Sequence, residues 1–179
     1  MSYLPSQPAE ARLLDVFRTF PEASRPLLDY HEALMRGPSD LSVAERELIA
    51  AYVSGLNDCD YCHGVHAVTA ARFGIDESLL AALLTDLESA PLVGRLRPVL
   101  AYVAKLTVTP DRITPSDAEA VLSAGWSEKA LHDAVSICGL FNLMNRLVSG
   151  LGITAGQDYF ETSGDRLAEG GYAELADLL

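Results

Sequence analysis

The hydrophobic positions of the chain recur every three to four residues, which is the period of helices with one buried face. Capping residues, Pro and Gly separate the periodic stretches; Ser42 and Glu45, for example, form a capping box before an apolar run. No alternating strand pattern bounded by hairpin turns occurs in the sequence. The pattern therefore predicts an all-α fold, a helical bundle with helices at about 10–20, 21–36, 43–54, 58–73, 76–85, 96–108, 115–124 and 127–150.

The 179 residues contain no linker, so we expect a single domain over residues 1–179. Within it we distinguish an N-terminal arm, residues 1–8, and an acidic C-terminal tail, residues 154–179. The tail has aromatic residues to bury, so it either packs near the site or over a neighbouring subunit, or stays solvated and partly mobile. Similar helix endings at 72–75 and 150–153 suggest an internally duplicated helical unit.

The formal net charge of −12 makes nucleic acid and anionic membrane surfaces unfavourable partners. No apolar run has the length of a bilayer span, and residues 1–8 lack the basic flank and apolar stretch of a signal peptide. We therefore expect a cytoplasmic protein. Its apolar helices exceed what two layers need, which predicts a homo-oligomer.

The candidate chemistry lies at the start of the helix predicted over 58–73. Cys59 and Cys62 are separated by two residues and His66 follows Cys62 by four, so the three side chains are expected on one helix face. Asn57 and Asp58 are good N-cap residues, which would place both thiols in the first turn. The positive end of the helix dipole then predicts lowered thiol pKa values.

This cluster supplies every role of a dithiol redox centre. Cys62, directly beside His66 on the helix, is predicted to be the attacking thiol, and Cys59 the resolving one. His66 would act as the base, and Glu47 on the preceding helix would accept its second ring N–H and fix its tautomer.

Other interpretations of the thiol pair stay open. A zinc-binding structural site could draw a fourth ligand from His63 or Asp58, although the usual second ligand pair is missing. The same disulfide could switch a non-enzymatic, redox-responsive oligomer. Elsewhere, Cys138 is expected as a small buried hydrophobe, and a polar group on the last long helix as a buried brace: Asn142, Asn145 and Arg146.

The residues around the thiols resemble a known family. The motif consists of Glu47, eleven intervening residues, Cys59-Asp60-Tyr61-Cys62, three intervening residues and His66. This motif, together with the segment 45–57 that contains Glu47, is similar to the alkylhydroperoxidase D-like (AhpD-like) proteins of the carboxymuconolactone decarboxylase superfamily. The later segment 140–148 resembles the peroxidase-related branch of that superfamily. The likeness extends from about residue 21 onward.

This resemblance implies an all-helical homo-oligomer that reduces hydroperoxides through a Cys59–Cys62 disulfide cycle with a Glu47–His66 proton relay. It further implies a peroxide substrate, an external dithiol or thioredoxin-like reductant, and no cofactor or metal. Members that open rings or decarboxylate act without this thiol pair, which counts against their chemistry here. One departure is that the characterised alkylhydroperoxidase has a second histidine where this chain has Tyr61, whereas His63 follows the pair.

Overall fold

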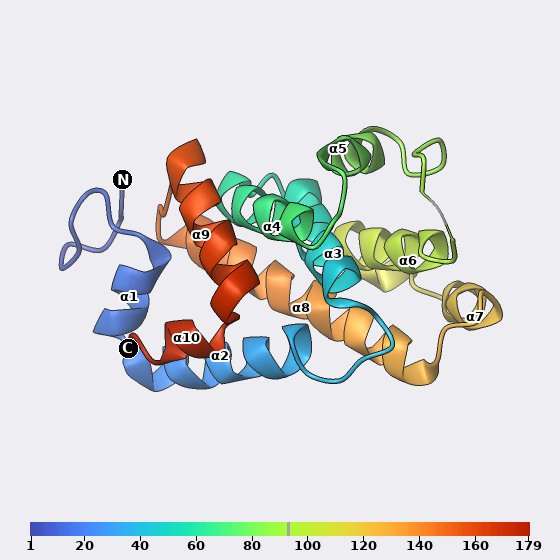
Figure 1. Ribbon diagram of the computed structural model, residues 1–179, viewed down its shortest axis with the longest axis horizontal. Helices are drawn as coiled ribbons and strands as arrows, with labels where there is room; N and C mark the ends of the chain where they lie inside the picture. Colours follow the sequence, from blue (N-terminus) through green and yellow to red (C-terminus); the bar gives the residue numbers. More distant parts are fainter. Residues whose placement is uncertain (93) are drawn as a thin grey trace.

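The computed structural model of the protein describes residues 1–92 and 94–179, and all regular structure in these residues is helical (Figure 1). The all-α prediction is confirmed. In chain order the elements are α1 (Leu13–Thr19), α2 (Pro21–Met35), α3 (Val43–Leu56), α4 (Asp60–Arg72), α5 (Glu77–Thr85), α6 (Arg97–Val108), the 3₁₀ turn η1 (Pro110–Arg112), α7 (Pro115–Ser123), α8 (Glu128–Gly150), α9 (Gln157–Gly170) and α10 (Ala173–Ala176).

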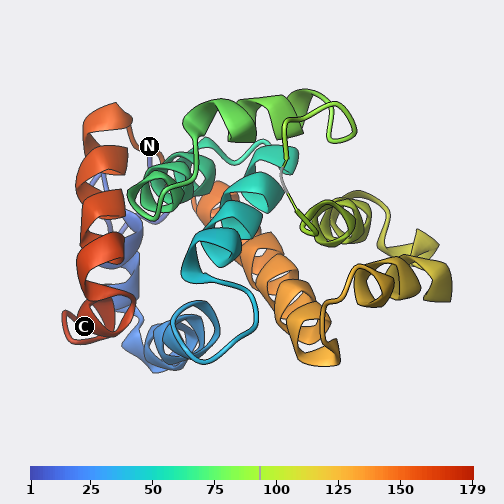
Figure 2. The same cartoon turned by 45° about the vertical axis from the view of Figure 1, so that its right-hand side comes forward.

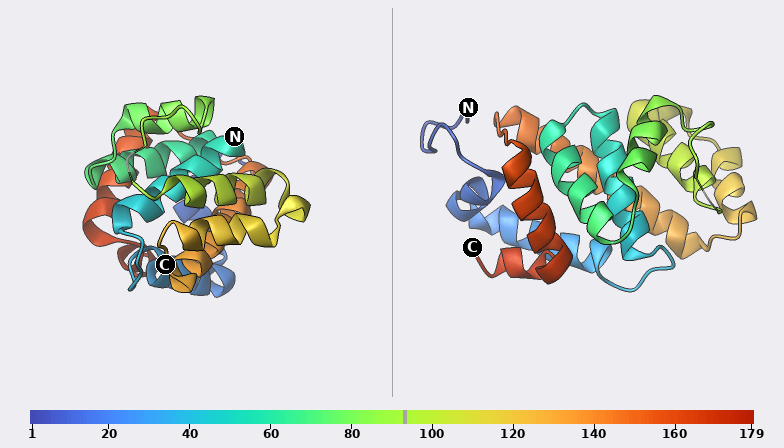
Figure 3. Two further views of the ribbon diagram at one scale, coloured as in Figure 1. Left: turned by 90° about the vertical axis from the view of Figure 1, so that its right-hand side faces the viewer. Right: turned by 45° about the horizontal axis from the view of Figure 1, so that its top comes forward.

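Helices α3 and α8 form the centre of the molecule (Figures 1 and 2). Helix α4 packs on α3, and α9 packs on the other side of α4, while α6 and α7 lie at the far end of α8. Both chain ends lie at the opposite end of the molecule, apart from each other, and α10 contacts α2 there (Figures 1 and 3). Segments from both halves of the sequence therefore surround the first turn of α4.

Helix α3 is buried on every face along residues 46–54. Its neighbours α4, α5, α6 and α8 cover it from several directions, which explains why its sequence is apolar all round and has little amphipathic character. One carboxylate, that of Glu47, is carried into this interior with no exposed surface. A buried charge of this kind requires partners.

The helix boundaries follow the capping residues that the sequence indicated. Ser42 and Glu45 form the predicted capping box, and Ser127 accepts a hydrogen bond from the backbone N–H of Ala130. The cysteine helix differs, because α4 begins at Asp60 and its N-cap is Cys59 itself. Asp58 has a φ of +52°, so the tight turn from α3 uses the left-handed conformation at this residue. Asn57 is the C-cap of α3, and neither Asn57 nor Asp58 is the N-cap of α4.

Two glycines bring α4 and α9 into close contact. A Cβ atom at Gly64 would collide with the ring of Phe160 on α9, and one at Gly164 would collide with the Val68 side chain on α4. The absence of side chains at both positions therefore lets the two helices approach closely.

The acidic tail is folded rather than solvated: residues 157–170 and 173–176 form α9 and α10, which pack on α4 and α2. The alternative of a mobile tail is thus wrong, and the tail lies near the site. The endings of α4 and α8 share one geometry, in which Gly74 and Gly152 have positive φ values, but a duplicated unit stays a prediction. No helix among the described residues is both long and apolar enough to cross a membrane.

Candidate active site

Glu47 lies at the centre of a buried polar cluster. Its Oε2 is 2.7 Å from His66 Nδ1, the contact that the sequence predicted. Its Oε1 accepts hydrogen bonds from Arg36 Nη1 at 2.6 Å and from the Tyr172 hydroxyl at 3.3 Å. Burial would raise the pKa of Glu47, but the hydrogen bond from His66 and the charges of His66 and Arg36 outweigh it and lower the pKa. Glu47 is therefore an anion at neutral pH.

Arg36 and Tyr172 were not anticipated from the sequence. Arg36 is the C-cap of α2, and it also donates to the carbonyl oxygen of Leu167 at 2.9 Å, which joins the end of α2 to α9. Its guanidinium stacks 5.1 Å from the Tyr172 ring centroid. No spacing rule predicts these contacts: the fold of the tail brings Tyr172 to Glu47, and the packing of the end of α2 brings Arg36 there.

The two thiols are free and buried, and they lie close enough to influence each other's pKa. The interaction with the Cys62 thiol lowers the pKa of Cys59 to about 6; burial opposes this shift, and the nearby side chains of Asn145 and Ser149 on α8 add to it. The interaction with Cys59 and burial both raise the pKa of Cys62. The expectation that both pKa values are lowered is therefore wrong for Cys62. The pair carries one negative charge at neutral pH, centred on Cys59 at the helix N-cap.

The predicted polar brace holds Cys59 in place. Asn145 is buried, donates to the Ser54 hydroxyl at 3.0 Å and accepts from Asn57 at 2.9 Å. Asn142 accepts from the same Asn57 amide at 3.2 Å. Arg146 is exposed and so does not belong to the buried part of the brace. Cys138 is buried as expected, and burial raises the pKa of its thiol.

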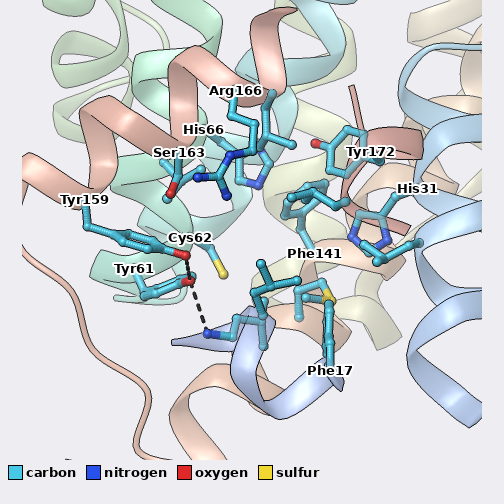
Figure 4. A pocket seen from close by; sticks show the side chains of 17 residues that line it. Phe17, His31, Tyr61, Cys62, His66, Phe141, Tyr159, Ser163, Arg166 and Tyr172 are labelled. Atoms are coloured by element: carbon cyan, nitrogen blue, oxygen red, sulfur yellow. Dashed lines mark hydrogen bonds between the residues drawn. The ribbon is translucent and has the colours of Figure 1, made fainter. Parts of the chain in front are cut away.

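Cys62 and His66 line one cavity, shown in Figure 4, whereas Cys59 faces a separate surface depression beside Asp58 and Ser149. The cavity itself has a volume of about 90 Å³, and about 690 Å³ when the open space at its mouth is included. Most of its wall is apolar, and its side chains come from α1, α2, α4, α8, α9 and the α10 region: Leu13, Leu14, Phe17, Leu28, Val65, Phe141, Met144, Leu167 and Leu175.

A second histidine, His31 of α2, also lines this cavity. Burial lowers its pKa to about 4, against the effect of a 2.7 Å hydrogen bond between its Nδ1 and the Leu27 carbonyl oxygen. The neutral ring therefore carries its proton on Nδ1, and Nε2 is an acceptor. Sequence reasoning missed His31, although its place on the apolar face of α2, beside Leu27 and Leu28, was a visible signal.

Tyr61 and His63, where the chain departs from the alkylhydroperoxidase motif, have their own hydrogen-bond partners. The Tyr61 hydroxyl lies 2.7 Å from that of Tyr159, and burial raises the pKa of Tyr61, so it is not an acid at neutral pH. His63 Nδ1 lies 3.0 Å from the Ala51 carbonyl oxygen, and its side chain lines a different depression. Within residues 1–92 and 94–179 no three His, Cys, Asp or Glu side chains are grouped to hold a metal ion, so the zinc alternative gains no support.

Residues 21–105, which include α3, α4 and both thiols, match the model of the carboxymuconolactone decarboxylase family. A search of curated proteins finds no significant match.

Solved structures extend the likeness over most of the chain. An uncharacterised peroxidase-related protein from Silicibacter sp. TM1040 is 30% identical, with a TM-score of 0.76 over 83% of this chain and 78% of its own. A peroxidase-related protein from Ralstonia eutropha JMP134, described as an alkylhydroperoxidase AhpD core, is 25% identical, with a TM-score of 0.75 over the same shares. A protein of unknown function from Agrobacterium tumefaciens shares the fold, at 18% identity and a TM-score of 0.67 over 79% of this chain and 96% of its own. The chain therefore belongs to the carboxymuconolactone decarboxylase superfamily, among its AhpD-like, peroxidase-related proteins.

Proposed function

We propose that the protein is a thiol-dependent reductase of organic hydroperoxides with an antioxidant role, working through a Cys59–Cys62 disulfide. The observation that carries the proposal is the pair of free, buried, adjacent thiols, one of which lines an apolar cavity together with the Glu47-bound His66. The alkylhydroperoxidase and peroxidase-related descriptions of similar structures support it.

In the first step, Cys62 Sγ attacks the terminal oxygen of the hydroperoxide, and the O–O bond breaks. The Cys62 proton passes to the neighbouring Cys59 thiolate. The leaving alkoxide takes a proton from the His66 ring and departs as an alcohol, while Glu47 stabilises the charge on the ring before transfer. Cys62 is now a sulfenic acid.

In the second step, the Cys59 sulfur attacks the sulfenic sulfur of Cys62. The Cys59 proton and the sulfenic hydroxyl leave as water, and a disulfide forms. Two thiols and one hydroperoxide thus give one disulfide, one alcohol and one water. An external dithiol or thioredoxin-like reductant then regenerates the thiols. Because Cys59 faces the separate depression, this reductant approaches from a different side than the peroxide.

A single-turnover experiment tests the cycle. One equivalent of cumene hydroperoxide should remove two thiols and form one cumyl alcohol, and the Cys59→Ser variant should accumulate a trappable sulfenic acid on Cys62. Cys138→Ser is the matched control and should behave as wild type, because this thiol lies outside the cavity. Sulfenic acid trapped only on Cys59, in the Cys62→Ser variant, would reverse the assignment.

The pH dependence of thiol alkylation gives a second measurement. Since the pKa of Cys59 is lowered to about 6, the alkylation rate of the reduced protein should rise through pH 6 and level off near neutrality. Cys62→Ala removes the S–H donor and should move this midpoint toward the ordinary thiol value. Sustained consumption of peroxide with dithiothreitol separates an enzyme from a redox-responsive oligomer, which would stop after one oxidation.

A further inference from the structure

Two polar side chains of α9 line the cavity on the side opposite α1 and α2. Ser163 and Arg166 stand one helical turn apart and so share a face of α9. Figure 4 shows the Arg166 side chain reaching from α9 toward the centre of the cavity, beside Ser163. Neither residue has a part in the disulfide cycle proposed above.

Ser163 is a polar group without a protein partner. The residue is only 8% exposed, and its Oγ atom makes no hydrogen bond with any other described residue. A buried hydroxyl in this state costs free energy, of the order of 1–3 kcal/mol, unless a ligand satisfies it. The hydroxyl is therefore available to a group inside the cavity.

Arg166 brings a positive charge that is not neutralised locally. Its neighbours on α9, Asp165 and Glu161, both bind Arg72 on the outer side, and Glu169 is exposed. The described residues include no hydrogen bond or ion pair of Arg166 itself. The charge of Glu47 is paired with Arg36, and its other oxygen is bound to His66. An apolar cavity with one such guanidinium at its wall favours an anion with a hydrocarbon body.

We propose that the cavity binds organic hydroperoxides that carry a carboxylate, with Arg166 and Ser163 as the carboxylate subsite. This inference rests on the proposed function and names its substrate class. The guanidinium donates two parallel N–H bonds to the carboxylate, and the Ser163 hydroxyl donates a third. The hydrocarbon lies on the apolar wall of Leu14, Phe17 and Leu28, and the hydroperoxide end meets Cys62.

Binding of a non-reactive probe tests the subsite without the redox reaction. The probes are para-isopropylbenzoate and its neutral amide, titrated calorimetrically into the reduced protein. The carboxylate should bind at least about 10-fold more tightly than the amide, the size of one charge-assisted contact. Arg166→Gln should remove this difference, Arg166→Lys should retain part of it, and Ser163→Ala should weaken only the carboxylate. Arg112→Gln, which removes an exposed arginine far from the cavity, controls for net charge.

Turnover supplies the second test. The substrates are the para-carboxylate of cumene hydroperoxide and its methyl ester. In wild type the ratio of their kcat/KM values should be about 10 or more, and in Arg166→Gln it should fall to about one. Equal loss on both substrates would place Arg166 on the peroxide group and overturn the inference. Equal binding of carboxylate and amide would overturn it too, even if both peroxides are reduced. Tight carboxylate binding with no peroxide reduction would instead overturn the proposed function alone.

Discussion

In the proposed function the chemistry of the cavity depends on Glu47, which holds a full negative charge in the interior. Its two oxygens bind His66 on one side and Arg36 with Tyr172 on the other, so the carboxylate orients the ring and is itself held in position. Such an arrangement fixes the tautomer of the histidine and stabilises its charged form. It also leaves Arg36, only 13% exposed, dependent on Glu47 for a counter-charge.

Glu47→Gln should therefore lower both activity and stability. The shape is kept, but the charge that supports His66 and Arg36 is lost. We expect hydroperoxide reduction at neutral pH to fall about 10- to 100-fold. We expect the free energy of unfolding to fall by roughly 2–4 kcal/mol, since one partner of a buried ion pair is left alone. Stopped-flow kinetics and urea unfolding measure the two effects.

Lowering the pH should reduce the effect of this substitution on stability. The folded pKa of Glu47 lies below its ordinary 4.5, so the stabilisation by its charge is complete at neutral pH and disappears as the pH falls through the folded pKa. The stability difference between wild type and Glu47→Gln should shrink accordingly. Glu119→Gln, a change of an exposed carboxylate on α7, is the control. Identical rates in Glu47→Gln and wild type would exclude the relay.

At the scale of elements, the crossing of α4 and α9 sets the width of the cavity. Gly64 and Gly164 allow the close approach, and α9 then places Ser163, Arg166 and Leu167 over Cys62. A wider crossing would move this wall away from the thiol. The helix contact thus links a packing detail to the shape of the site.

Gly164→Ala should destabilise the protein by about 1–3 kcal/mol, because the new methyl group overlaps Val68 and the backbone of Thr69 lies close by. Gly150→Ala is the matched control, since a Cβ there meets no atom within 4 Å, and it should be neutral or slightly stabilising. Chemical denaturation measures both variants. Equal stability of the two would mean that α9 shifts on α4 without cost.

The elements were largely predictable because their signals are local. The capping boxes at Ser42 and Thr114 and the i, i+4 spacing of Cys62 and His66 are read within a few residues of sequence. The Glu47–His66 contact followed from a spacing between adjacent helices. The N-cap position of Cys59 was missed because Asp58 adopts a left-handed conformation, which polar composition does not reveal. Arg36, His31 and Tyr172 depend on long-range packing of α2 and the tail.

At the scale of the whole molecule, a net charge of −12 coexists with exposed apolar side chains. Val108, the last residue of α6, is 63% exposed, and Leu143 of α8 is 52% exposed. The two helices that carry these residues pack on each other. Burying such residues in a second copy is favourable, whereas the like charges of two copies repel each other.

We expect the protein to form a homo-oligomer whose stability increases with salt. Static light scattering at micromolar concentration should give a mass at least twice 19.2 kDa at about 0.15 M salt, where charges beyond roughly 8 Å are screened. Leu143→Glu should shift the mass toward the monomer, and Tyr3→Glu, at a more exposed site on the N-terminal arm, should not. A monomeric mass for wild type at all salt concentrations would contradict the proposal.

Tyr172 and α9 form one wall of the Cys62 cavity, and this has a consequence during synthesis on the ribosome. The thiols, His66 and Glu47 are synthesised long before Tyr172. At about 5–20 residues per second, the interval is on the order of ten seconds. During that interval Cys62 is open to the surrounding solution, because the α9 wall of its cavity has not yet been made. On the proposed function, a nascent chain whose thiols are oxidised then would fold with its disulfide already formed, and it would need its reductant before it could reduce a peroxide.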